Sequence, residues 1–294
     1  MNQLQTLSGA LCELLKQIEG TDIKLIIGGG FGIYLKLQHV RKLGTRTLID
    51  PEFWPEARST NDLDLFLRPE LLVDSAKLKP LAQAIYELGY EPVPGAEKFQ
   101  FVKPADGETE AAKVKIDILT GPRDAFSESN VRVDDRRIRP RPSVDLHAHP
   151  VDEGLTLERE LSSVAISSNL GRGEPWVGEV FLPHPFTFIM MKLFAFRDRL
   201  KTDSDQQKAQ YHALDVYSVL ATTTEKEWKQ ALSLHEEFRQ HPFVIEAGRI
   251  ADEYFDRREQ LGLIRLQESH YYRDDFKLSD FISALLELFP IVAR

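Results

Sequence analysis

The strongest constraint on the fold is a run in which acidic and apolar residues alternate, STNDLDLFL over residues 59–67. A period of two is typical of a β-strand that buries one of its faces. Asp62 and Asp64 therefore project from one face of this strand, while Leu63 and Leu65 project from the other face into a core. The run predicts a half-buried strand whose polar face carries two carboxylates.

A second alternating run, VKIDIL over residues 114–119, predicts another strand with Asp117 on its polar face. If the two strands are neighbours, Asp62, Asp64 and Asp117 converge on one spot. Three carboxylates repel one another there, so the arrangement favours a site for divalent cations. Two metal ions held by three acids are typical of phosphoryl and nucleotidyl transfer. Lys115 points to the same side as Asp117, either as an exposed strand lysine or as a counterion for the acids.

A glycine-rich turn, GGGFG over residues 28–32, follows a short apolar run at residues 24–27 and precedes a helical pattern. The backbone N–H groups of such a turn can cradle phosphate, and a packed strand–helix turn is the alternative. No Gly-Lys-Ser/Thr follows, so the turn is not a Walker motif. Ile33 stands where a dinucleotide fingerprint needs its third glycine, which disfavours a nicotinamide or flavin enzyme.

Composition narrows the class of protein further. The chain has 294 residues, enough for two domains. Its 37 basic and 46 acidic residues give a net charge of −9, which argues against broad coating of DNA. The single cysteine, Cys12, excludes an internal disulfide and favours a reducing compartment. We see neither a signal peptide nor a membrane-spanning run, so we expect a cytoplasmic protein without a membrane partner.

Periodicity and breakers predict an α+β domain followed by an α-helical domain. We place the catalytic domain at 1–183 and the α-helical domain at 184–294. The expected helices are 4–19, 31–43 and 69–88, and the expected strands 24–27, 62–67, 99–102 and 113–119, with a hairpin turn at 104–110 and short strands within 123–180.

The order of glycine turn, Asp-x-Asp and later strand aspartate resembles the nucleotidyltransferase superfamily that includes DNA polymerase β. The run Arg58-Ser59-Thr60-Asn61-Asp62-Leu63-Asp64 is most similar to the AbiEii-type nucleotidyltransferases. Those are cytoplasmic bacterial proteins, many of them toxins of toxin–antitoxin pairs. The resemblance covers residues 23 to 220. The sequence departs from the family pattern at two places. The gap between Gly29 and Asp62 is long, and Tyr211-His212 stands where a basic-acidic doublet is expected.

The resemblance implies a fold, an activity and its residues. The fold would be a mixed β-sheet flanked by helices. An NTP would be the substrate and Mg²⁺, as two ions, the cofactor; the acceptor would be RNA, such as a tRNA end, or a protein hydroxyl, and an antitoxin would be a partner. Asp215 matches a helix aspartate of the family. The implied metal ligands and catalytic residues are Asp62, Asp64 and Asp117; the implied nucleotide contacts are Gly28, Gly29, Ser59 and Lys192.

Several alternatives stay open. Lys192 lies in an apolar helical run, where a lysine either meets an anion, pairs with a core acid or extends to the surface. Ser59 either contacts phosphate or caps a turn. Five arginines at residues 132–141 could follow an RNA backbone or form a solvated loop. His147 and His149 lack the further ligands of a metal site. A small-molecule nucleotidyltransferase and a non-catalytic nucleotide- or partner-binding module are the other functions.

Overall fold

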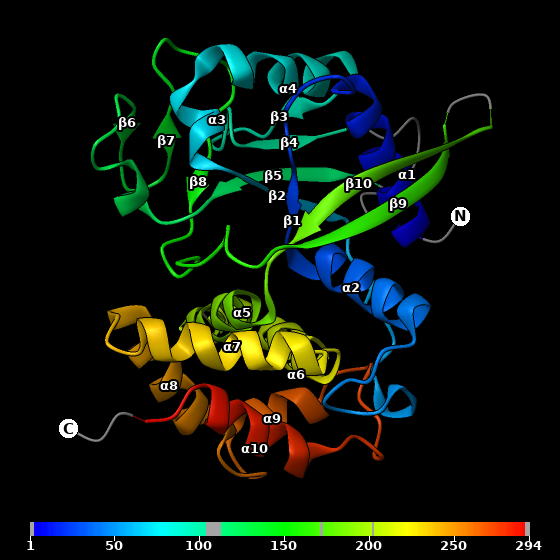
Figure 1. The fold of residues 1–294 in the computed structure, drawn as a ribbon, viewed down its shortest axis with the longest axis vertical. Coiled ribbons are helices and arrows are strands. Elements are labelled where there is room, and N and C mark those ends of the chain that lie inside the picture. The colour runs from blue at the N-terminus through cyan, green and yellow to red at the C-terminus, as the bar shows by residue number, and fades with distance from the viewer. Residues whose placement is uncertain (1–2, 104–112, 171–172, 202, 292–294) are drawn as a thin grey trace. The chain divides into compact units, whose positions relative to one another are not determined.

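The computed structural model describes residues 3–103, 113–170, 173–201 and 203–291 (Figure 1). The chain forms two compact units. The sheet unit comprises residues 1–35, 59–152 and 156–183, and the helical unit comprises 36–58, 153–155 and 184–294. The predicted catalytic and helical domains stay a prediction; in the structure, residues 36–58 and 153–155 group with the helices. The expected hairpin turn at 104–110 lies outside the described residues.

A mixed sheet in the order β3-β4-β5-β2-β1-β10-β9 forms the centre of the sheet unit, and β8 also pairs with β5. Neighbours β2 and β5 are parallel, as are β1 and β10, while β1 and β2 are antiparallel. The strands are β1 Ile26–Ile27, β2 Asp62–Leu67, β3 Glu91–Pro92, β4 Gln100–Val102, β5 Lys115–Thr120, β8 His149–Pro150, β9 Ser162–Leu170 and β10 Glu174–Leu182. The predicted α+β class, with helices flanking a mixed sheet and a helical region after it, is confirmed.

Strand β2 has the predicted alternation. Leu63 and Leu65 are fully buried, whereas Asp62 and Asp64 are half-buried on the opposite face. The β9–β10 hairpin is longer than the short strands expected for this region, with nine residues in each strand. Val164 and Ile166 are its buried residues in β9, and they alternate with small polar or exposed residues that mask the apolar pattern.

The helices of the sheet unit begin and end near the predicted positions, with one exception. They are α1 Gln3–Gln17, α2 Gly29–Leu43, α3 Pro69–Val73 and α4 Ser75–Glu87. Helix α1 packs on β9 and β10 (Figure 1). A single helix over 69–88 is wrong, because Asp74 leaves helical geometry. Its carboxylate accepts hydrogen bonds from the backbone of Ala76 at 3.0 Å and Lys77 at 3.4 Å, and so caps a new helix.

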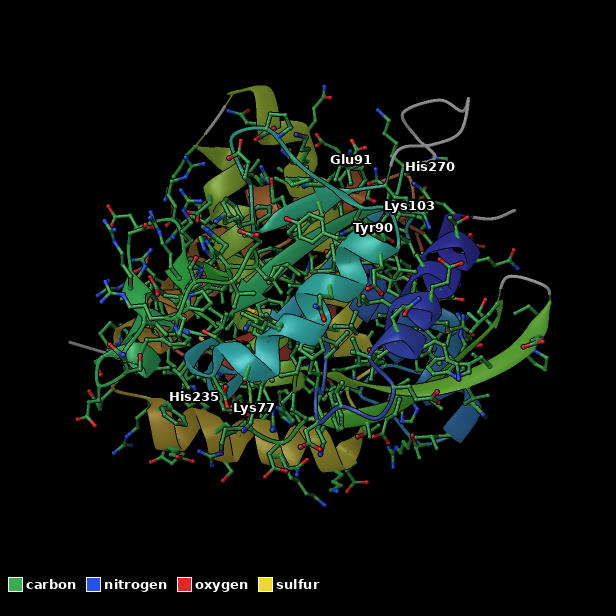
Figure 2. All side chains as sticks on the ribbon, turned by 90° about the horizontal axis from the view of Figure 1, so that it is seen from above. Lys77, Tyr90, Glu91, Lys103, His235 and His270 are labelled. Carbon is green, nitrogen blue, oxygen red and sulfur yellow. The ribbon has the colours of Figure 1, made fainter. Side chains whose placement is uncertain are left out.

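Lys103, at the end of β4, connects elements at one edge of the sheet. Its Nζ lies 5.7 Å from the centre of the Tyr90 ring and 3.5 Å from Oε2 of Glu13 on α1. Lys103 and Tyr90 are labelled in Figure 2. The aliphatic stem and the charge of the lysine thus cover the aromatic ring and bridge to the helix.

The helical unit contains α5 Pro185–Leu200, α6 Ala209–Ala221, α7 Glu225–Phe238, α8 Pro242–Phe255, α9 Leu261–Gln267 and α10 Leu278–Leu288. Its core is aromatic: Tyr217 stacks on Phe276 at 4.4 Å between ring centres, and Phe196 lies 5.1 Å from Phe255. The predicted helical character after Pro185 is confirmed. No helix among the described residues is long and apolar enough to cross a membrane.

Candidate functional site

The parallel pairing of β2 and β5 places the predicted acids on one face of the sheet. Asp64 is the Cα partner of Asp117, and Asp62 is the partner of Lys115. On the other side of β5, Gln100 of β4 is the partner of Asp117. Directly paired residues project from the same face, so these five side chains share it. We refer to Asp62, Asp64 and Asp117 as the acid face.

The glycine turn is built against the acid face. The backbone N–H of Gly28 donates to the carbonyl of Asp64 at 2.9 Å. Gly29 has a φ of +61°, and a Cβ on it would lie 1.6 Å from Oδ2 of Asp64. A Cβ on Gly28 would lie 2.4 Å from the ring of Phe66. Both positions therefore require glycine, Gly28 because of packing and Gly29 because of the carboxylate.

The contact also brings the positive end of a helix dipole next to a carboxylate. Helix α2 begins at Gly29, so its first turn, where backbone N–H groups lack helical partners, opens beside the carboxylate of Asp64. The N–H of Gly28 is already used by Asp64. A phosphate cradle at this turn would therefore rely on the N–H groups from Gly29 onward.

Asp117 is a carboxylate of the acid face whose pKa is raised. Lys115 Nζ lies 3.2 Å from its oxygens, but Oδ1 is buried and accepts no hydrogen bond among the described residues. Burial raises the pKa of Asp117, and the neighbouring charge of Asp62 adds to the rise; Lys115 and a hydrogen bond from Gln100 oppose it without cancelling it. The face thus holds a carboxylate with unused acceptor capacity.

The acid face is a candidate binding site for a divalent cation. Among the described residues, no group of three or more His, Cys, Asp or Glu side chains is arranged to hold a metal ion. The donor set is nevertheless right for Mg²⁺, which prefers carboxylate oxygens, and the buried Oδ1 of Asp117, which accepts no hydrogen bond among the described residues, is an acceptor that a cation would satisfy. The metal-binding roles of Asp62, Asp64 and Asp117 stay a prediction.

Lys192 and Asp215 meet in the helical unit. Lys192 Nζ lies 2.7 Å from Oδ2 of Asp215, and Arg58 holds both carboxylate oxygens, with Nε–Oδ1 at 2.8 Å and Nη2–Oδ2 at 3.0 Å. Burial alone would raise the pKa of Asp215, but the two cations hold it well below its usual range. The structure thus pairs Lys192 with a core acid. Its contact with nucleotide stays a prediction.

Two further residues singled out in the sequence are Ser59 and His212. The Ser59 hydroxyl donates to Oε1 of Gln3, and its nucleotide contact stays a prediction. Burial lowers the pKa of His212 to about 3, and the charges of Lys192 and Arg58 contribute, so the ring is neutral at pH 7.

The chain was compared with known proteins. No protein-family model and no curated protein matches it. A solved structure of an antigenic nucleotidyltransferase-like protein from Paracoccidioides brasiliensis is similar at 16% identity and a TM-score of 0.38, over 83% of this chain and 91% of that one. The solution structure of the antibiotic-resistance factor ANT(2'')-Ia is similar at 13% identity and a TM-score of 0.32, over 82% and 100%. Values this low establish no family membership.

Sequence reasoning missed two partners of the predicted residues. Gln100 is the polar residue of an otherwise apolar strand segment, FQFV, which is a signal that it serves the polar face. Arg58 precedes the run at 59–67 that contains the acidic strand, but its partner Asp215 lies 157 residues away, so nothing local reveals the pair.

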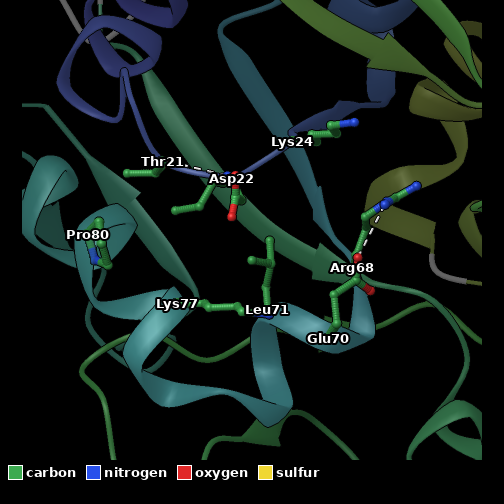
Figure 3. A pocket seen from close by; sticks show the side chains of 9 residues that line it. Thr21, Asp22, Lys24, Arg68, Glu70, Leu71, Lys77 and Pro80 are labelled. Atoms are coloured by element: carbon green, nitrogen blue, oxygen red, sulfur yellow. Dashed lines mark hydrogen bonds and ion pairs between the residues drawn. The ribbon is translucent and has the colours of Figure 1, made fainter.

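A cavity of about 280 Å³ lies elsewhere in the sheet unit (Figure 3). Arg68 directly follows β2, so the cavity is at the opposite end of this strand from Asp62. Its charges are mixed, and Arg68 pairs with Glu70 at 3.2 Å. It is lined by Thr21, Asp22, Ile23, Lys24, Arg68, Glu70, Leu71, Lys77 and Pro80.

Proposed function

We propose that the chain is a Mg²⁺-dependent nucleotidyltransferase that moves a nucleoside monophosphate from an NTP to a hydroxyl group of RNA or protein, with release of pyrophosphate. The observation that carries the proposal is the contact of Gly29 with the carboxylate of Asp64, in register with Asp117. A helix N-terminus, which binds phosphate, is thereby adjacent to carboxylates, which bind the cation that accompanies phosphate.

In this proposal, different residues bind the cation, bind the phosphates and accept the proton. Asp62, Asp64 and Asp117 would hold Mg²⁺, which supplies positive charge for the phosphates. The N–H groups from Gly29 onward donate to phosphate oxygens, while Gly28 fixes the turn on Asp64. Asp117, whose pKa is raised, takes the proton of the acceptor hydroxyl. The nucleotide contacts of Ser59 and Lys192 are proposed from the family resemblance, since both side chains already have protein partners.

The test is transfer of label from each α-labelled NTP, in Mg²⁺, to total RNA or to protein. Label on RNA or on protein identifies the acceptor. Asp64→Asn is expected to abolish the label, because the carboxylate charge is lost while the shape is kept. Asp22→Asn, an exposed aspartate of the same unit, is the matched control and should keep full activity. Labelling that survives in Asp64→Asn, or that never occurs with any NTP, overturns the proposal.

A toxin role, with an antitoxin as partner, is the narrower proposal and rests on the resemblance to AbiEii-type proteins. It requires that the transfer reaction disables a cellular acceptor. Its test is growth after induced expression, which is described with the predictions below.

A further inference from the structure

The arginines at 132–141 form an ordered ribbon in the sheet unit. Strands β6 Arg132–Val133 and β7 Ile138–Arg139 pair antiparallel, beside β8 (Figure 1). Ile138 is fully buried and exchanges backbone hydrogen bonds with Ala148, at 2.8 and 3.2 Å. The ribbon is therefore anchored by an apolar face, and we name residues 132–141 the arginine ribbon.

Like charges oppose each other on this ribbon. Arg132 is the Cα partner of Arg139, an arrangement that is destabilising when no anion intervenes. Asp134 cannot neutralise both. Its carboxylate accepts from the backbone of Arg136 at 3.0 Å and Arg137 at 2.9 Å, and it pairs with the guanidinium of Arg139.

Most of the positive charge remains uncompensated. Arg132, Arg136 and Arg141 are exposed and form no ion pair among the described residues. The guanidinium of Arg137 donates to the backbone carbonyl of Glu97, at 3.4 Å, and forms no ion pair among the described residues. In a chain with a net charge of −9, the ribbon sets five arginines against two acids of its own, Asp134 and Asp135, so it is a local excess of cations.

The ribbon is also tied to the strand that carries Asp117. The carbonyl of Arg136 lies 2.7 Å from Nδ1 of His149, and His149 pairs with Leu119 of β5. Burial lowers the pKa of the nearby His147 to about 4; the charges of Lys98, Arg137 and Arg139 add to this, and Asp145 opposes it.

We propose that the arginine ribbon docks the phosphate backbone of a nucleic acid. A single phosphate would need an enclosed pocket, whereas these guanidinium groups are exposed along a ribbon, as a polyanion requires. A membrane surface would need apolar side chains beside the cations, and the ribbon exposes only Val133, at 39%. The inference deepens the proposed function, because it would bring an RNA acceptor to the unit that carries the acid face.

The test measures binding without NTP, so that it is independent of transfer. Fluorescence anisotropy is recorded with a labelled single-stranded RNA, with DNA of the same sequence, and with anionic lipid vesicles as a third arm. The variant is Arg132→Gln/Arg136→Gln/Arg141→Gln. The matched control is Arg239→Gln/Arg249→Gln/Arg257→Gln, which removes the same charge from exposed arginines of the helical unit that pair with local acids. Thermal unfolding verifies that both variants remain folded.

Three lost phosphate contacts, at about 0.7 released counterions each, should flatten the salt slope of binding by about 2. Between about 50 and 200 mM salt, this corresponds to about a 20-fold smaller loss of affinity in the ribbon variant than in the wild type. The control variant should behave as the wild type does. The nucleic acid that the wild type binds more tightly, RNA or DNA, is the one that the ribbon recognises.

Equal binding by the ribbon and control variants, or binding of vesicles without nucleic acid, overturns the docking proposal. If transfer of label persists while the ribbon variant binds normally, only the docking surface is wrong. If nucleic acid binds through the ribbon but no label is transferred, the proposed activity fails and the docking surface stands.

Discussion

Replacing Gly29 by alanine probes the contact on which the proposed site depends. The new Cβ would meet Oδ2 of Asp64 at 1.6 Å, and the backbone would have to keep a φ of +61°. The left-handed conformation costs an alanine about 1–2 kcal/mol. Forced overlap in a packed region adds about 1–3 kcal/mol, so we expect a total loss of unfolding free energy of about 2–5 kcal/mol.

Two control substitutions separate these contributions. Gly44 has the same φ of +61°, and Gly89 in the sheet unit has a φ of +81°; neither would bring a Cβ within 4 Å of another atom. Gly44→Ala and Gly89→Ala should therefore cost only the backbone part. The additional cost of Gly29→Ala should disappear in an Asp64→Ala background, where the clashing oxygen is absent.

The measurement is urea unfolding of each single variant and of the double variant, followed by circular dichroism. The reasoning is refuted if Gly29→Ala costs no more than Gly44→Ala, or if Asp64→Ala does not relieve it. Either result would mean that the glycine turn does not press on this carboxylate in solution.

Three further predictions follow from the same contacts. Mg²⁺ should raise the Tm of the wild type but not that of Asp64→Asn/Asp117→Asn, measured by calorimetry; an equal rise in both would remove the cation from this face. Asp215→Asn should cost about 3–5 kcal/mol at pH 7, because Arg58 and Lys192 lose their buried counterion. Since the folded pKa of Asp215 is lowered, its stabilisation is present above the unfolded pKa of about 3.9 and is lost as pH falls below it, so urea midpoints of variant and wild type should converge in acid and not in alkali. Induced expression should arrest bacterial growth for the wild type and not for Asp64→Asn; growth arrest by both would separate toxicity from transfer.

Local patterns were sufficient for much of the sheet unit. The period of two in β2 and β5 depends on neighbouring residues alone, so the faces of Asp64 and Asp117 were predictable, and the structure adds their register. The helix break at Asp74 was not predicted. The apolar residues keep their helical spacing on both sides of Asp74, and this spacing favours one continuous helix over two. Ser162–Leu170 was underestimated since its polar face consists of small residues.

Side-chain pairs between residues far apart in the sequence could not be predicted. The Arg58–Asp215 pair joins positions that no local rule connects. Residues 36–58 group with the helical unit through further long-range contacts, such as the backbone hydrogen bonds from Leu48 to Thr223 and from Ile49 to Ala221. The same holds for Lys192, whose apolar surroundings indicated an anion without indicating which one. Sequence reasoning found the need for a partner, and the fold supplied a carboxylate from α6.

Lys115 has a consequence for the balance of charge on the acid face. Its ammonium lies 3.2 Å from Asp117, so it serves as an internal counterion of the acid. Because the two residues are on the same strand, this neutralisation requires no distant part of the chain. Mutual repulsion among the carboxylates is thereby reduced in the folded sheet by a charge that the strand itself supplies.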